Sequence, residues 1–132
     1  MANILIVDDD YSIRTLFQFV FMEAGHTTAL AKDGKDALQK LETFTPDLML
    51  LDISMPVMTG PEFIKELHGL AAARPELARI PFLVLTGENF MKLKEHYGME
   101  SNPDCKAFLP KMTQQATVLS LAAKILAEYG KT

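Results

Sequence analysis

The sequence predicts an α/β fold, a doubly wound parallel sheet with helices on both of its faces. Short apolar runs of strand length recur along the chain, and between them lie segments whose apolar residues are spaced three and four apart. Five strand–helix units follow one another in this way, and such alternation favours a parallel sheet. A chain of 132 residues is long enough to enclose one sizeable core, so we expect a single domain.

The first half of the chain predicts three strands and two helices. The strands are Ile4–Val7, Thr27–Ala31 and Leu48–Leu51. Of these, Thr27–Ala31 is the least apolar and is expected at or near an edge of the sheet. Gly25 ends a helix whose apolar residues are Ile13, Leu16, Phe17, Val20, Phe21 and Ala24. A second helix follows Asp33 and Gly34, and its apolar residues are Ala37, Leu38 and Leu41.

The second half predicts two more strands and three more helices. Gly60 and Pro61 open a helix, because proline is tolerated in a first turn. Its apolar face is formed by Ile64, Leu67, Leu70 and Ala71. The strands are Phe82–Leu85 and Ala107–Leu109, and a weakly patterned helix lies between them, near Asn89 to Tyr97. Gly130 ends the last helix, whose apolar residues are Val118, Leu121, Ala122, Ile125, Leu126 and Tyr129.

The bulk composition argues against several classes of protein. The net charge of −4 makes nucleic acid or another polyanion a poor partner. A single cysteine excludes an intrachain disulfide and suits a reducing compartment. The first residues lack the features of a signal peptide, and no apolar run reaches membrane-spanning length. We therefore expect a soluble cytoplasmic protein without membrane insertion.

Four of the predicted strands end in side chains that suit phosphoryl chemistry. In chain order these residues are Asp8 and Asp9 after the first strand, Asp52 after the third, Thr86 after the fourth and Lys111 after the fifth. The carboxyl ends of parallel strands meet at one edge of a sheet, so we expect all of them in one crevice. Carboxylate oxygens select a hard cation such as Mg²⁺, and a carboxylate can act as the nucleophile toward phosphorus. An ammonium and a hydroxyl suit the charge that spreads over the oxygens of a transferring phosphoryl group.

Taken singly, these residues have ordinary explanations. The run Asp8–Asp10 can cap the following helix, and Asp10 is expected to do so in any case. Asp52 can be a turn residue, and Lys111 can be a solvated lysine. Only their conjunction at one edge of the sheet indicates a site.

Four segments carry this conjunction, namely Ile4–Asp10, Leu51–Pro56 with Gly60, Leu85–Gly87 and Phe108–Lys111. In order and spacing they resemble the receiver domain of two-component response regulators, in particular single-domain receivers of the chemotaxis kind. The resemblance spans nearly the whole chain. It implies a flavodoxin-like sheet with strand order 2-1-3-4-5, flanked by five helices.

The resemblance also implies a role for each residue of the predicted site. Asp52 would accept a phosphoryl group, forming an aspartylphosphate, from a histidine kinase or a phosphotransfer histidine. The implied ligands of Mg²⁺ are Asp8, Asp9, Asp52 and the backbone carbonyl of Ser54. Thr86 and Lys111 would contact the phosphoryl oxygens, and Phe108 would be the switch aromatic coupled to Thr86.

The same resemblance implies a phosphoacceptor in signalling rather than an enzyme, one that assists its own phosphorylation and dephosphorylation. Residues 1–132 would form one receiver domain without an effector domain, and the protein would signal by docking to another protein. The residues name neither the kinase nor the downstream target. They also leave open a homodimer that forms on phosphorylation.

The chain departs from the family pattern after the last strand. Receivers usually have Lys-Pro there, with a cis bond, whereas Lys111 is followed by Met112 and preceded by Pro110. A cis bond before a residue other than proline costs about 3–4 kcal/mol, so we expect the Lys111–Met112 bond to be trans. Pro110 itself suits the end of an edge strand, where a missing N–H costs little.

Two other classes of protein share parts of the pattern. A phosphatase of the haloacid dehalogenase type also uses an aspartyl nucleophile after a strand. It needs a second aspartate two residues later, where this chain has Ser54. A flavodoxin-like FMN module needs a first loop that cradles a phosphate group, which the acids Asp8–Asp10 would repel.

Overall fold

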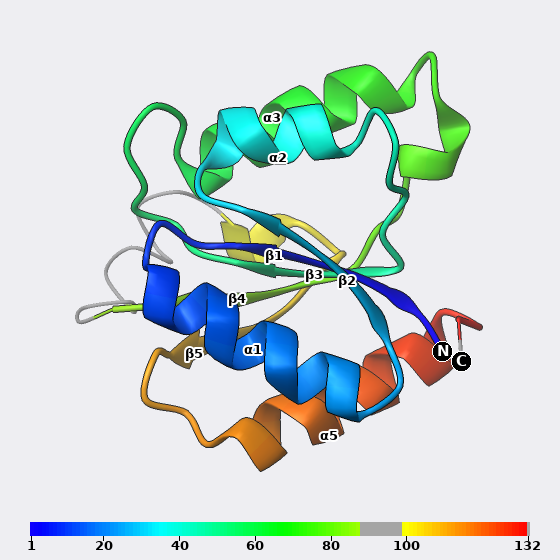
Figure 1. Ribbon diagram of the computed structural model, residues 1–132. Helices are drawn as coiled ribbons and strands as arrows, with labels where there is room; N and C mark the ends of the chain where they lie inside the picture. Colours follow the sequence, from blue (N-terminus) through cyan, green and yellow to red (C-terminus); the bar gives the residue numbers. More distant parts are fainter. Residues whose placement is uncertain (88–98, 132) are drawn as a thin grey trace.

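The computed structural model describes residues 1–87 and 99–131, with one parallel sheet between two layers of helices (Figure 1). The strands are β1 (Asn3–Val7), β2 (Thr27–Ala31), β3 (Leu48–Leu51), β4 (Phe82–Thr86) and β5 (Cys105–Pro110). The described α-helices are α1 (Tyr11–Glu23), α2 (Gly34–Lys40), α3 (Gly60–Ala71) and α5 (Gln115–Glu128), with 3-10 turns η1 (Pro75–Leu77) and η2 (Met99–Ser101). The five strands lie in the order β2-β1-β3-β4-β5, which confirms the predicted fold class and strand order. The helix expected near Asn89 to Tyr97 lies outside the described residues.

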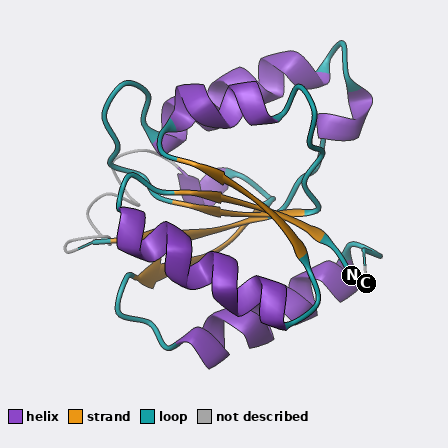
Figure 2. Ribbon diagram, in the orientation of Figure 1, coloured by secondary structure: helices purple, strands orange, loops and turns teal. Residues whose placement is uncertain are grey.

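Helices cover both faces of the sheet, which explains why its inner strands β1, β3 and β4 are apolar except for Asn3 and Thr86 at their ends. α2 and α3 lie on one face, and α1 and α5 lie on the other (Figures 1 and 2). Every residue of β3 and β4 is buried. One core lies between the sheet and α2 with α3, and it includes Leu51 and Phe63. The second core lies under α1 and α5, and it includes Phe17, Phe21 and Leu126.

Short polar side chains start the first three helices. Asp10 caps α1 as predicted, because its carboxylate accepts the backbone N–H of Ser12 at 2.9 Å. Asp33 caps α2 in the same way. Thr59 and Glu62 form a reciprocal capping box at the start of α3. Asp10 and Asp33 lie within three residues of the end of a strand, whereas Thr59 follows the longer loop after β3.

The last strand is an edge strand, as the position of Pro110 predicts. β5 pairs only with β4 in the described sheet, and Pro110 lies opposite Thr86. The backbone N–H of Lys111 donates to the carbonyl of Thr86 at 2.8 Å, so the ladder continues one residue past the proline. The described peptide bonds are all trans, which confirms the expectation for Lys111–Met112.

Two leucines that were predicted on apolar helix faces lie at the surface instead. Leu16 of α1 is 37% exposed and Leu70 of α3 is 39% exposed. A helix turns by about 100° per residue, so Leu16 points well away from its neighbour Phe17, which is buried against the sheet. Spacing alone made Leu16 compatible with the inner face, but the orientation of the helix placed it outside. Among the described helices, none combines the length and the apolar composition needed to cross a membrane.

Candidate functional site

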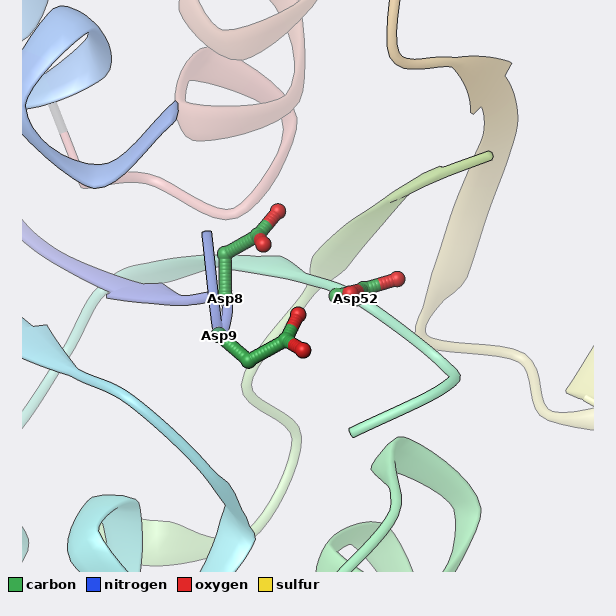
Figure 3. Close-up of side chains that lie close together, drawn as sticks. All are labelled: Asp8, Asp9 and Asp52. Atoms are coloured by element: carbon green, nitrogen blue, oxygen red, sulfur yellow. The ribbon is translucent and has the colours of Figure 1, made fainter. Parts of the chain in front are cut away.

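Asp8, Asp9 and Asp52 meet at the carboxyl edge of the sheet (Figure 3). Asp8 and Asp9 follow β1 and Asp52 follows β3, and these two strands are parallel neighbours. The backbone N–H of Asp52 donates to Val7 at 2.9 Å, so the sheet's own hydrogen bonds hold this position. One carboxylate oxygen from each acid lies within 4.8 Å of those of the other two. Asp8 and Asp52 are buried, whereas Asp9 is exposed.

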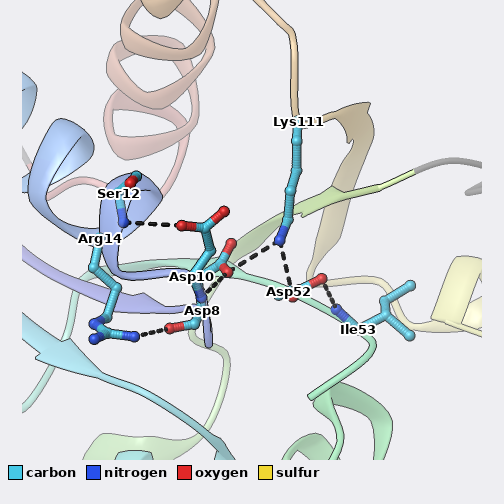
Figure 4. A network of polar contacts seen from close by, with 7 residues as sticks. All are labelled: Asp8, Asp10, Ser12, Arg14, Asp52, Ile53 and Lys111. Carbon is cyan, nitrogen blue, oxygen red and sulfur yellow. Dashed lines mark hydrogen bonds and ion pairs between the residues drawn. The ribbon is translucent and has the colours of Figure 1, made fainter.

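Lys111 joins two of these acids (Figure 4). Its Nζ lies 3.1 Å from Oδ1 of Asp8 and 3.3 Å from Oδ2 of Asp52. The lysine follows β5, so its side chain reaches past the end of β4 to the ends of β3 and β1. The other oxygen of Asp52 accepts the backbone N–H of Ile53 at 2.8 Å. Both buried carboxylates are therefore paired with a charge and hydrogen bonded.

The cluster still holds more negative charge than Lys111 neutralises. Burial raises the pKa of Asp8 to about 6 from 3.8, although its hydrogen bond from the N–H of Asp10 works against the rise. Burial also raises the pKa of Asp52, and Lys111 opposes that rise while Asp9 adds to it. Burial alone would lower the pKa of Lys111, but the attraction of Asp8 and Asp52 outweighs it and raises that pKa. Three carboxylates facing one ammonium would be stabilised by a further cation.

The donor set fits a hard divalent cation. Three carboxylates offer oxygen ligands from two neighbouring strand ends, and the described part of the chain places no histidine or cysteine among them. Oxygen ligands favour Mg²⁺ or Ca²⁺ over the metals that bind sulfur or imidazole. Mg²⁺ commonly takes one or two carboxylates and keeps several waters. Ser54 lies two residues after Asp52, near the start of the β3–α3 loop, and is exposed.

Thr86 and Phe108 complete the set of predicted residues. Thr86 is the last residue of β4 and is buried, so its hydroxyl belongs to the same sheet edge as Asp52. Phe108 of β5 lies opposite Val84 of β4, and both pack in the core under α2 and α3. Because side chains alternate along a strand, Val84 and Thr86 face the same side of the sheet. Phe108 and Thr86 therefore lie on one face of neighbouring strands.

Two further residues shape the site. Arg14 of α1 donates from Nη1 to the backbone carbonyl of Asp8 at 2.7 Å, which ties the first helix to the acid loop (Figure 4). The sequence analysis did not single out Arg14, because an arginine in a first helical turn carries no specific signal. Gly60 was recognised only as part of a motif, and the structure supplies its reason. A Cβ atom at Gly60 would lie 2.4 Å from the carbonyl oxygen of Asp52, so no larger residue fits there without a shift of the backbone.

Comparison with known proteins agrees with this geometry. The family model of the response regulator receiver domain matches residues 4–122. The alkaline phosphatase synthesis transcriptional regulatory protein PhoP of Bacillus subtilis is 38% identical over 114 residues, which are 83% of this chain and 44% of PhoP. The first curated relatives that match are thus more than twice as long as the matched region. The matching family is neither a haloacid dehalogenase phosphatase nor an FMN module.

Solved structures show the same fold. The chemotaxis response regulator CheY4 of Vibrio cholerae superposes with a TM-score of 0.79 at 32% identity, over 96% of this chain and 99% of that one. The receiver domain of a signal transduction histidine kinase from Syntrophus aciditrophicus superposes with a TM-score of 0.82 at 25% identity. That comparison covers 100% of this chain and 95% of the other.

Proposed function

This chain belongs to the response regulator receiver domain family, and from that premise we propose that Asp52 accepts a phosphoryl group from a phosphohistidine. Receiver domains are signalling domains that take phosphoryl groups from histidine kinases or phosphotransfer proteins. In the proposed step, a carboxylate oxygen of Asp52 attacks phosphorus and forms the new O–P bond. The P–N bond to the donor breaks, and the imidazole leaves with its electron pair.

The observation that carries this proposal is the place of Asp52 among the other polar groups. Asp52 follows β3, which lies between β1 and β4. Asp8 and Asp9 therefore lie on one side of it, and Thr86 with Lys111 belong to the strands on the other side. A phosphoryl group on Asp52 would meet a cation site on one side and a hydroxyl and an ammonium on the other. Asp8 shares the bond to Lys111, but it follows β1, whose neighbours are β2 and β3, so it is not beside Thr86 of β4.

The remaining residues hold and neutralise the transferring group in this proposal. Asp8, Asp9, Asp52 and the backbone carbonyl of Ser54 would hold Mg²⁺, which supplies positive charge to the phosphoryl oxygens when it is bound. Lys111 bonds to Asp8 and Asp52 at 3.1 and 3.3 Å, so its ammonium already lies close to the oxygen of Asp52 that would carry the phosphoryl group. We propose that Lys111 then exchanges a carboxylate partner for a phosphoryl oxygen.

The proposed output is docking to another protein. Thr86 would bond the phosphoryl group, and Phe108, which lies on the same face of the adjacent strand, would respond to that bond. The net charge of −4 supports a protein partner rather than nucleic acid. Tight and salt-sensitive binding of duplex DNA by this chain would contradict that part of the proposal.

Labelling with acetyl phosphate and Mg²⁺, followed by the intact mass of the protein, tests the role of Asp52. Wild type should gain one phosphoryl group, and Asp52→Asn should gain none. Asp10→Asn is a matched control, because it removes a neighbouring acid while asparagine keeps the helix cap. It should be labelled like wild type. Equal labelling of Asp52→Asn and wild type would place the phosphoacceptor elsewhere.

Titration calorimetry with Mg²⁺ alone tests the cation site separately. We expect weak binding in wild type, and loss of both binding and labelling in Asp9→Ala. Asp9 is exposed, so its removal leaves the core intact. An Asp9→Ala variant that binds Mg²⁺ as wild type does would refute this ligand set.

A further inference from the structure

Arg14 is a charged residue for which α1 itself gives no reason. It lies in the first turn of that helix, where its backbone N–H donates to the carbonyl of the cap Asp10 at 3.0 Å. The aligned peptide dipoles make this end of a helix positive, so a cation here weakly destabilises the helix. A residue that works against the local structure is expected where a site nearby needs it.

The guanidinium of Arg14 binds a peptide group. Its Nη1 donates to the backbone carbonyl of Asp8 at 2.7 Å, although three carboxylates lie in the same loop (Figure 4). The ring of Tyr11 supports the guanidinium, whose central carbon lies 5.7 Å from the ring centre. A hydrogen bond from a charged donor is shorter and stronger than one between neutral groups. The bonded carbonyl belongs to the peptide that joins Asp8 to Asp9.

This peptide connects two of the acids that the proposed cation site needs. The N–H of Asp8 donates to the carbonyl of Ala31 at 3.0 Å, and the N–H of Asp10 donates to Oδ1 of Asp8 at 2.9 Å. These two bonds hold the loop on either side of the peptide. Arg14 holds the peptide itself, and with it the backbone rotation that decides where the exposed side chain of Asp9 points.

We propose that Arg14 is a positioning residue for the cation site, and that through the carbonyl of Asp8 it fixes Asp8 and Asp9 in the arrangement that holds a hard divalent cation. This role rests on the proposed function, which assigns Mg²⁺ to these acids. Replacing a residue that orients metal ligands typically weakens metal binding by about 10–100-fold. Charge alone would act in the opposite direction, because removing a positive charge beside a cation site strengthens its attraction for Mg²⁺. The two effects therefore differ in sign.

Titration calorimetry of the full chain with Mg²⁺ alone tests this role. Arg14→Met removes the charge and the donor, and it should weaken Mg²⁺ binding by about tenfold or more. Arg14→Lys keeps a charged donor and should bind Mg²⁺ more tightly than Arg14→Met does. Arg74→Met is the matched control, because Nη1 of Arg74 also donates to a backbone carbonyl, that of Leu41 at 2.9 Å, just past the ends of α3 and α2. It should bind Mg²⁺ like wild type.

The Mg²⁺ dependence of labelling by acetyl phosphate separates positioning from a loss of structure. Arg14→Met should need about tenfold more Mg²⁺ than wild type to reach half of its maximal labelling rate. Its rate at saturating Mg²⁺ should approach that of wild type, because the bound cation then holds the acids in place. A variant that had merely lost structure would show a lower maximal rate instead.

Unchanged or tighter Mg²⁺ binding by Arg14→Met would overturn the role of Arg14 while leaving the cation site in place. So would an Arg74→Met variant that is equally impaired, an Arg14→Lys variant that binds no better than Arg14→Met, or a lower maximal rate with an unchanged Mg²⁺ requirement. Mg²⁺ binding that is absent from wild type, or unchanged in Asp9→Ala, would instead refute the cation site and the role of Arg14 with it.

Discussion

Replacing Asp8 by asparagine should stabilise the metal-free protein at neutral pH, although Asp8 belongs to the proposed site. Asp8 is buried, and its pKa is raised to about 6 from 3.8, mainly by burial. That difference means that the ionised form costs the folded state about 3 kcal/mol above pH 6. Asparagine keeps an acceptor for the N–H of Asp10, which lies 2.9 Å from Oδ1 of Asp8. The raised pKa already includes the opposing attraction of Lys111, and burial of the amide has a cost of its own, so we expect a net gain of about 1–3 kcal/mol.

The pH dependence of this gain follows from the direction of the pKa change. Between the unfolded and the folded pKa of Asp8, the folded state holds a proton that the unfolded state releases. Protonation of Asp8 therefore adds stability as the pH falls from 7 through 6, and this contribution is complete near pH 4. Asp8→Asn lacks this group, so its advantage should shrink as the pH falls. Mg²⁺ should act in the opposite way and stabilise wild type more than the variant.

Urea denaturation in the presence of a chelator measures this prediction, at about pH 7.5 and about pH 4.5. A thermal midpoint should rise by roughly 3–5 °C per kcal/mol for a chain of this length. Asp10→Asn removes the same charge from an exposed position and keeps its cap, so it should change stability little. An Asp8→Asn variant that is less stable than wild type at neutral pH, or a gain that does not change with pH, would refute the reasoning.

Three other changes probe positions outside the acid cluster. Gly60→Ala should lower the free energy of unfolding by roughly 1–3 kcal/mol and reduce labelling, because the added Cβ would press on the carbonyl of Asp52. Gly69→Ala in the same helix is the control: its Cβ meets no atom within 4 Å, so it should be neutral or stabilising in urea denaturation. Tyr129→Phe removes a 2.6 Å hydrogen bond to the buried carboxylate of Asp104 and should lower the free energy of unfolding by about 1.5–3 kcal/mol; an unchanged urea midpoint would contradict this. Burial and then the N-terminal charge lower the pKa of His26 below 6.5, and its Nδ1 accepts the N–H of Ala2. Neutral His26 should therefore contribute stability that is lost as the pH falls below about 6.5, so wild type should lose stability relative to His26→Gln over this range; a difference that stays constant with pH would contradict this.

The grouping of the candidate site residues at one edge of the sheet could be predicted from the sequence because of how parallel strands are arranged. Each apolar run ends within one residue of the end of its strand, and parallel strands bring all of their carboxyl ends to one edge. Asp8, Asp52, Thr86 and Lys111 could thus be grouped although more than a hundred residues separate the first from the last. Helix caps such as Asp10 were predictable for a similar reason, since a cap depends on a few neighbouring residues.

The tertiary structure decided the distances between side chains, which the order of strands along the chain does not determine. The pattern places Lys111 at the edge, but only packing brings its Nζ to 3.1 Å from Asp8. The same packing buries Asp8, and this burial raises the pKa of its carboxyl group although Lys111 opposes the rise. Leu16 shows the same limit, because helical spacing allows a residue on more than one face until the helix is docked on the sheet. Local sequence determines which backbone conformations and strand ends are available. The rotation of each helix, the depth of burial and the meeting of distant charges depend on the whole core packing at once.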